Sequence, residues 1–168
     1  EIKKAHLIGY SMGGAIAQEV AINHPALVDR LVLMATYDAA DPRGAELFRG
    51  FAYLRRHTDR ETYLKLTLPW GFTYKEYQTP RLIDTVVNEA LEDELYQESE
   101  AFERQMEATI SFNSRGRLHL IESPTLLVFG EEDIMTPLRF AREMVRAIKH
   151  ARLVTLEGTG HLFFRTHV

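Results

Sequence analysis

The chain has 168 residues, of which 45% are hydrophobic and 26% charged, a composition typical of one globular domain with a sizeable core. The formal net charge of -4 provides no electrostatic attraction to nucleic acid or to an anionic membrane. The absence of cysteine excludes disulfide and thiolate chemistry and favours a cytoplasmic location, and we find no signal peptide and no apolar run that could span a membrane.

The first part of the chain, residues 1–40, alternates apolar strands with an apolar helix. Residues 5–9 fit a buried parallel strand that ends in glycine. Residues 14–23 are rich in Ala, Ile and Val on nearly every side, which predicts a buried helix. Pro25 ends this helix, because the residue before a proline resists the helical conformation. Residues 31–35 predict a second buried strand.

Residues 41–117 break this rhythm. The segment is long, rich in charged and aromatic residues and mostly helical in pattern, and turn sequences at 41–44 and 113–116 mark its two ends. Within it, residues 89–109 predict one long exposed helix. We interpret the segment as a helical cap inserted over a sheet.

The last part, residues 118–168, contains two more apolar strands, at 125–130 and 151–157. Between them lies an amphipathic helix at 137–149, for which we expect Thr136 to be the N-cap. Strand, helix and strand at both ends of the chain predict an α/β fold with a mostly parallel sheet flanked by helices.

The turn between the first strand and its helix reads Gly9-Tyr10-Ser11-Met12-Gly13. A sharp strand-to-helix turn of this kind exposes a serine at its apex, and Gly9 and Gly13 supply the small neighbours that it needs. Ser11 is therefore the candidate nucleophile. The backbone N–H of Met12 is the candidate oxyanion donor, because it follows the nucleophile at a helix N-terminus. The alternatives are a turn that only packs, or a phosphate-binding loop without the expected lysine.

A serine hydroxyl needs a base to accept its proton and an acid to orient that base. Asp133, in the loop after the strand at 125–130, is the candidate acid, and His161, after the strand at 151–157, is the candidate base. Functional side chains of parallel sheets gather at these carboxyl ends. Competing acids are Glu131, Glu132 and Asp38, and competing histidines are His6, His24, His57, His119, His150 and His167.

Aromatic side chains concentrate in the first half of the expected cap: Phe48, Phe51, Tyr53, Trp70, Phe72, Tyr74 and Tyr77. They could wall an apolar substrate pocket or simply pack the cap on the sheet. We select Trp70 and Phe72 from this segment, Tyr10 from the turn at residues 9–13 and Met135 from the loop after the strand at 125–130 as pocket candidates. Met12 could line the same pocket.

The turn at residues 9–14, the loop at 130–137 and the segment Gly158-Thr159-Gly160-His161 together resemble the α/β-hydrolase superfamily. The order Ser11, Asp133, His161 along the chain is the order of the triad in that family. The nearest resemblance is to capped hydrolases that need no cofactor: esterases, enol-lactonases and carbon–carbon bond hydrolases. The resemblance therefore implies no cofactor and no metal. Haloalkane dehalogenases are similar but use aspartate as nucleophile, so Ser11 argues against that activity.

We expect a serine hydrolase that acts on a small carboxylic ester or lactone through an acyl-enzyme on Ser11. A carbon–carbon bond hydrolase is a further enzymatic alternative. A ligand-binding receptor is another alternative, since plant strigolactone and karrikin receptors resemble this fold and keep the triad.

One departure from the family concerns the strands that precede the serine turn and carry the second oxyanion donor. The chain starts at Glu1, close to the strand at residues 5–9, and ends seven residues after His161. We therefore expect a partial α/β-hydrolase fold, the C-terminal portion only, with the N-terminal strands absent and with little activity unless it is completed. The strand at residues 5–9 would then be an exposed edge and could mediate self-association.

Overall fold

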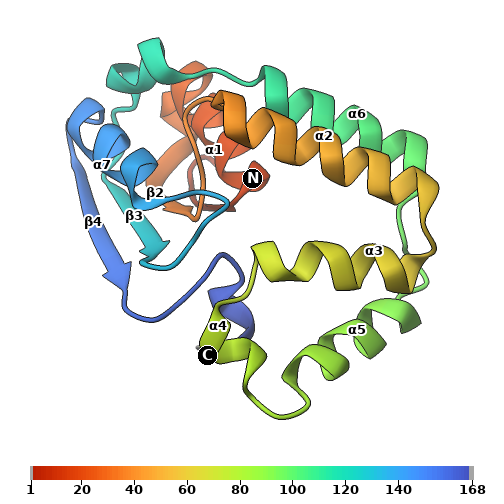
Figure 1. Ribbon diagram of the computed structural model, residues 1–168. Helices are drawn as coiled ribbons and strands as arrows, with labels where there is room; N and C mark the ends of the chain where they lie inside the picture. The colour runs from red at the N-terminus through yellow and green to blue at the C-terminus, as the bar shows by residue number, and fades with distance from the viewer. Residues whose placement is uncertain (1, 167–168) are drawn as a thin grey trace.

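The computed structural model describes residues 2–166 and contains a four-stranded parallel sheet (Figure 1). The strands lie side by side in chain order: β1 (Ala5–Tyr10), β2 (Val28–Met34), β3 (Thr125–Gly130) and β4 (Ala151–Leu156). The pairing sets Gly9 beside Leu33 and Leu127 beside Leu153. All four expected strands are confirmed. Within the described residues, β1 and β4 form the two edges of the sheet.

One face of the sheet packs against α1 (Met12–Asn23) and α7 (Leu138–Ala147), and the 3-10 helix η3 (Arg115–Leu120) contacts both helices. These elements and the central strands share one core cluster, in which Leu33, Leu127 and Phe129 are fully buried. Helix α1 contributes Ala15, Ala17 and Ala21 to it, small side chains that let a helix approach a sheet closely. The short 3-10 helix η1 (Pro25–Leu27) joins α1 to β2.

Helices fill the chain between β2 and β3: α2 (Pro42–His57), α3 (Arg60–Thr67), η2 (Leu68–Trp70), α4 (Tyr74–Tyr77), α5 (Leu82–Glu92) and α6 (Ser99–Ser111). Helices α2 and α6 lie side by side, and α3 packs against α5 (Figure 1). An antiparallel bridge between Ala39 and Asn113 joins the two ends of this helical segment. The last described element is η4 (Phe163–Arg165), and the Thr166 hydroxyl that follows it donates to Glu76 of α4 at 2.6 Å. No helix among residues 2–166 is long and apolar enough to cross a membrane.

The single helix expected at residues 89–109 is wrong, because the chain breaks between α5 and α6. Arg60 donates hydrogen bonds to the carbonyl oxygens of Ala90, Leu91 and Asp93, which caps the end of α5. The ring of Tyr96 stacks on the Arg60 guanidinium, whose carbon lies 3.8 Å from the ring centroid. All of these contacts involve Arg60 of α3, which is distant in the sequence from the break that they stabilise. The local helical periodicity of residues 89–109 therefore does not reveal the break.

Candidate active site

Ser11 occupies a strained turn between β1 and α1. Its backbone has φ 51° and ψ -120°, a conformation that few residues other than glycine adopt and that costs about 1–3 kcal/mol. The Ser11 N–H donates to the carbonyl of Met34 at 2.9 Å, and the Thr36 hydroxyl donates to the carbonyl of Ser11 at 2.7 Å. The end of β2 therefore holds the serine in its strained conformation.

The glycines around Ser11 differ in how closely other atoms approach them. A Cβ at Gly9 would lie 2.4 Å from the carbonyl oxygen of Gly13, and one at Gly14 would lie 2.5 Å from the Thr36 hydroxyl oxygen. A Cβ at Gly13 would meet no heavy atom of the described residues within 4 Å. The expectation that Gly9 and Gly13 are the required small residues therefore holds for Gly9, while the second crowded position is Gly14.

The structure brings Ser11, His161 and Asp133 together at the carboxyl ends of β1, β4 and β3. The Nε2 atom of His161 lies 3.0 Å from the Ser11 Oγ, and its Nδ1 atom lies 2.8 Å from an Asp133 carboxylate oxygen. His161 is 4% exposed and Asp133 is 3% exposed. One imidazole thus connects the serine hydroxyl to a buried carboxylate.

Asp133 is held as a carboxylate by several donors. Its Oδ1 accepts hydrogen bonds from the backbone N–H groups of Met135 and Thr136, each at 2.8 Å, and its Oδ2 accepts one from the Thr136 hydroxyl at 2.7 Å. Burial raises the pKa of Asp133. The hydrogen bond with His161, the charge of His161 and the hydrogen bonds from Thr136 together lower it by more, so the pKa of Asp133 lies below its usual value.

Thr136 was expected to be the N-cap of the following helix, and this is wrong. Helix α7 begins at Leu138, Pro137 occupies the N-cap position, and the Thr136 hydroxyl is bonded to Asp133. An N-cap side chain accepts a hydrogen bond from a backbone N–H, whereas the Thr136 hydroxyl donates one to the Asp133 carboxylate, and no side-chain cap bond is formed at α7. The residue therefore supports the acid rather than the helix.

The competing side chains make other contacts. Asp38 is buried and bonded to the Arg115 guanidinium at 2.8 and 3.1 Å, and Glu131 accepts from the Thr155 hydroxyl at 2.7 Å. Glu132 is exposed. Among the histidines, His6 lies 3.2 Å from Asp29. His167 lies outside the described residues.

The loop that carries His161 is fixed from two sides. The Tyr10 hydroxyl donates to the carbonyl of His161 at 2.9 Å, and the two rings lie 5.2 Å apart. Burial, together with the charge of Asp133, raises the pKa of Tyr10, so the phenol stays protonated as a donor. On the other side, the N–H of Leu162 donates to the carbonyl of Gly71 at 3.0 Å.

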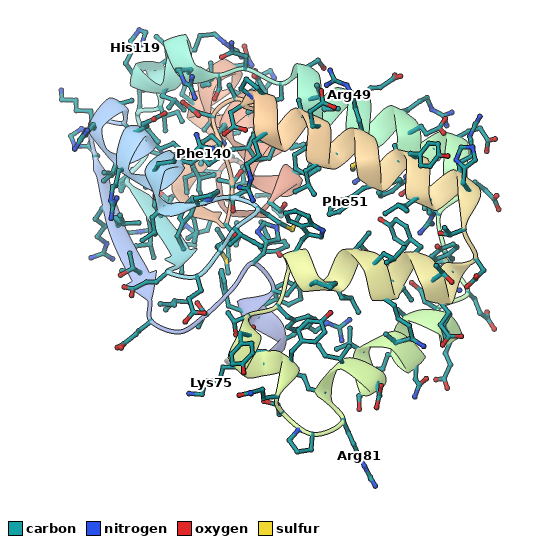
Figure 2. All side chains as sticks on the ribbon, viewed as in Figure 1. Arg49, Phe51, Lys75, Arg81, His119 and Phe140 are labelled. Carbon is teal, nitrogen blue, oxygen red and sulfur yellow. The ribbon has the colours of Figure 1, made fainter. Side chains whose placement is uncertain are left out.

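A cavity of about 370 Å³ opens beside Ser11, between the sheet and the helical segment. Figure 2 shows Phe51, one of its lining residues, on the side of α2 that faces α3. The described lining residues carry no charged side chain; they are Tyr10, Ser11, Met12, Gly13, Tyr37, Phe48, Phe51, Tyr63, Phe102, Gln105, Met106, Thr109 and Met135. The volume and the apolar lining suit a small organic ligand.

The sequence profile of the alpha/beta hydrolase fold family matches residues 1–168. The chain belongs to this family. It is 30% identical to a pyrrolizixenacetamide deacetylase of Xenorhabdus hominickii over 93% of the chain, and 30% identical to a pimeloyl-[acyl-carrier protein] methyl ester esterase of Neisseria meningitidis over 97% of the chain. The solved structure of an enol-lactonase from Burkholderia xenovorans superposes with a TM-score of 0.79 at 25% identity, over 92% of the chain.

These α/β hydrolases are longer than the chain. It spans 58% of the deacetylase, 53% of the esterase and 58% of the enol-lactonase structure. The four described strands and the helices between them therefore correspond to somewhat more than half of each relative.

The pocket residues selected from the sequence of this α/β hydrolase are only partly brought together. Tyr10, Met12 and Met135 line the cavity, whereas Trp70 and Phe72 do not. Trp70 lies in a second hollow that it shares with Phe51. Phe72 is 5% exposed and packs in a cluster with Leu68, Val86 and Val87. Both side chains are used to pack the helical segment of the α/β hydrolase.

Sequence reasoning missed the part of the cavity wall that α6 supplies. Phe102, Met106 and Thr109 are spaced by four and three residues, so they lie on one face of the helix. That period was visible in the sequence and predicts a buried face. It could not show that the buried face of this helix lines the serine site rather than another helix.

Proposed function

We propose that this chain supplies the catalytic residues of a serine hydrolase that cleaves a small carboxylic ester or lactone. The observation that carries the proposal is the hydrogen-bonded series from Ser11 through His161 to Asp133, which opens on a neutral, mainly apolar cavity. The names of the three relatives refer to an acetamide, a methyl ester and an enol-lactone, all of which are acyl compounds.

In the proposed reaction, the Nε2 atom of His161 accepts the proton of the Ser11 hydroxyl while the Ser11 oxygen attacks the carbonyl carbon. The negative charge on the carbonyl oxygen is stabilised by the Met12 N–H, the first of α1, because the first N–H groups of a helix have no intrahelical partner. His161 then returns the proton to the leaving alcohol. Water releases the acyl group in a second step that uses His161 in the same way.

In this reaction Asp133 has two roles. It holds the Nδ1–H tautomer of His161, which leaves Nε2 free to accept the serine proton. Its lowered pKa keeps it negative, so it stabilises the imidazolium that forms in each step.

The test uses the protein as it occurs naturally. A fluorophosphonate probe should label Ser11, and p-nitrophenyl acetate, butyrate and hexanoate should be hydrolysed. Ser11→Ala should lose both activities, while Ser111→Ala, at an exposed serine on α6, should keep them. If the natural protein neither reacts with the probe nor hydrolyses any ester, the proposal fails. Labelling and tight ligand binding without turnover would favour a receptor.

A further inference from the structure

The loop that carries His161 lies between the sheet and the helical segment, with close contacts on both sides (Figure 1). On the sheet side, a Cβ at Gly130, the last residue of β3, would lie 2.4 Å from the carbonyl oxygen of Thr159 and 2.6 Å from that of Gly160. On the other side, the loop contacts Gly71, which follows η2. Both approaches are closer than a Cβ atom would allow.

Gly71 contacts the residues immediately before and after the histidine. Its carbonyl oxygen accepts a hydrogen bond from the Leu162 N–H at 3.0 Å, and a Cβ at Gly160 would lie 2.7 Å from that same oxygen. A Cβ at Gly71 would lie 2.7 Å from the Cδ1 of Leu162 and 2.8 Å from its Cγ. The Leu162 side chain packs on the apolar cluster of Leu68, Phe72, Val86 and Val87.

This close approach, rather than backbone conformation, is what requires glycine at position 71. Gly71 has φ -98° and ψ -31°, values in the right-handed helical region that other residues adopt. Alanine could take the same backbone conformation, so it would act through its contact with Leu162. Because Leu162 is bonded to His161, a shift of Leu162 would move the imidazole, whose Nε2 lies 3.0 Å from the Ser11 Oγ.

Gly71 is separate from the cavity beside Ser11. Helices α2, α3 and α6 supply most of the cavity wall, and the described lining does not include Gly71, Gly160 or Leu162. A change at Gly71 should therefore displace the base without removing a contact with the substrate. The helical segment thus has two separable tasks, one at the cavity wall and one at the histidine loop.

We propose that Gly71 is a positioning residue for the catalytic histidine, through which the helical segment sets the distance between the His161 imidazole and the Ser11 hydroxyl. The inference rests on the proposed ester or lactone hydrolysis, in which His161 is the base, and extends it to a residue outside the triad. Misplacing a catalytic group by about 1 Å can cost about 100-fold in rate, so this positioning should be visible in kcat.

Gly71→Ala tests the contact directly in the natural protein. For p-nitrophenyl butyrate, kcat should fall by about 10- to 100-fold, while KM should stay within about twofold because the cavity lining is unchanged. Gly50→Ala is the matched control, since its Cβ, on α2, would meet no heavy atom within 4 Å. That variant should keep both constants. An unchanged kcat in Gly71→Ala would overturn the inference.

A second substitution separates positioning from a merely structural role. Leu162→Ala removes the Cγ and Cδ1 atoms that a Cβ at Gly71 would meet. Alone, it should lower Tm, because the apolar cluster loses a contact, yet keep kcat within about threefold, because the backbone hydrogen bond to Gly71 remains. Combined with Gly71→Ala, it should restore kcat to the level of Leu162→Ala although Tm stays low. A double variant no faster than Gly71→Ala would overturn the inference.

Gly160→Ala tests the same contact from the histidine loop, and it does so even if Gly71→Ala does not fold. Its Cβ would lie 2.7 Å from the carbonyl oxygen of Gly71, a backbone atom that Leu162→Ala does not remove. The kcat of Gly160→Ala should fall, and Leu162→Ala should not restore it. An undiminished kcat, or recovery on adding Leu162→Ala, would show that the contact with Gly71 does not set the position of the loop.

A proton NMR signal separates this inference from the proposed function. The Nδ1 proton of His161 lies in the 2.8 Å hydrogen bond to Asp133, and a buried imidazole proton bonded in this way gives a resolved low-field resonance. Gly71→Ala should shift or broaden this resonance, and the double variant with Leu162→Ala should restore it. If the natural protein hydrolyses no ester, the proposed function fails, yet this response would still show that Gly71 positions His161. A resonance that Gly71→Ala leaves unchanged would overturn the inference.

Discussion

At the residue scale, the geometry around Ser11 depends on partners that contact the reacting groups indirectly. Thr136 bonds Asp133 through its hydroxyl and its backbone, and the Tyr10 hydroxyl bonds the His161 carbonyl. Tyr10 lines the cavity as expected, but its hydroxyl is already used to position the histidine loop. Positioning of this kind keeps the imidazole within hydrogen-bonding distance of the serine.

Replacing Asp133 by Asn tests the role of the buried carboxylate. The amide cannot hold the same tautomer of His161, so kcat for a p-nitrophenyl ester should fall by about 1,000- to 10,000-fold at neutral pH, as in serine proteases. Steady-state kinetics measure the change. Glu132→Gln, at the exposed neighbour, should leave kcat within about twofold. A loss of less than about tenfold in Asp133→Asn would contradict the role.

The same variant has a predicted pH dependence of stability. The pKa of Asp133 is below its usual 3.8 in the folded protein, so the carboxylate stabilises the fold above the unfolded pKa. This contribution disappears as the pH falls through the folded pKa. The Tm difference between the natural protein and Asp133→Asn should therefore be largest near neutral pH and narrow below about pH 4. A Tm difference that does not narrow as the pH falls further below about 4 would count against the lowered pKa.

At the element scale, the junction of β1, α1 and β2 places the serine. Thr36, just beyond β2, lies against Gly14 in the first turn of α1, and its hydroxyl donates a hydrogen bond to the carbonyl of Ser11. The helix can come this close only because Gly14 has no side chain. The strained serine and the position of α1 are thus parts of one packing arrangement.

Gly14→Ala should disrupt this arrangement. Its Cβ would lie 2.5 Å from the Thr36 hydroxyl oxygen, so Thr36 or α1 must move, and overpacking of this kind costs about 1–3 kcal/mol. Fluorophosphonate labelling of Ser11 should slow, and denaturant unfolding should measure the loss. Gly50→Ala, in α2 with no heavy atom within 4 Å of its Cβ, should instead stabilise by about 0.5–1 kcal/mol. Unchanged labelling and stability in Gly14→Ala would refute this account.

At the scale of the whole molecule, the sheet of the described residues has one covered face and one partly open face. On the open face Ile8 is 66% exposed and Val154 is 44% exposed, although parallel sheets are usually covered on both sides. Ile8 is also on the edge strand β1. An edge strand with an exposed apolar side chain favours pairing with another chain.

We predict that residues 1–168, produced alone, self-associate through β1. Ile8→Lys should reduce the apparent mass in light scattering, because a charged side chain on an edge strand opposes pairing. Leu95→Lys, at a residue that is 90% exposed between α5 and α6, should leave the association unchanged. A monomeric chain at all concentrations, or equal effects of both variants, would show that β1 is not the contact.

The sequence by itself determined the strands, the turn at Ser11 and the order of Ser11, Asp133 and His161, because strand periods, glycine spacing and loop position are local signals. Only the tertiary structure decided that Gly14 rather than Gly13 is crowded, that α5 and α6 are separate, and that Tyr37 and Thr109 line the cavity while Trp70 and Phe72 do not. Each of these depends on side chains far apart in the chain, such as Thr36 beside Gly14 or Arg60 beneath Tyr96. Local patterns carry no information about which distant neighbour will be met, since packing between elements sets it.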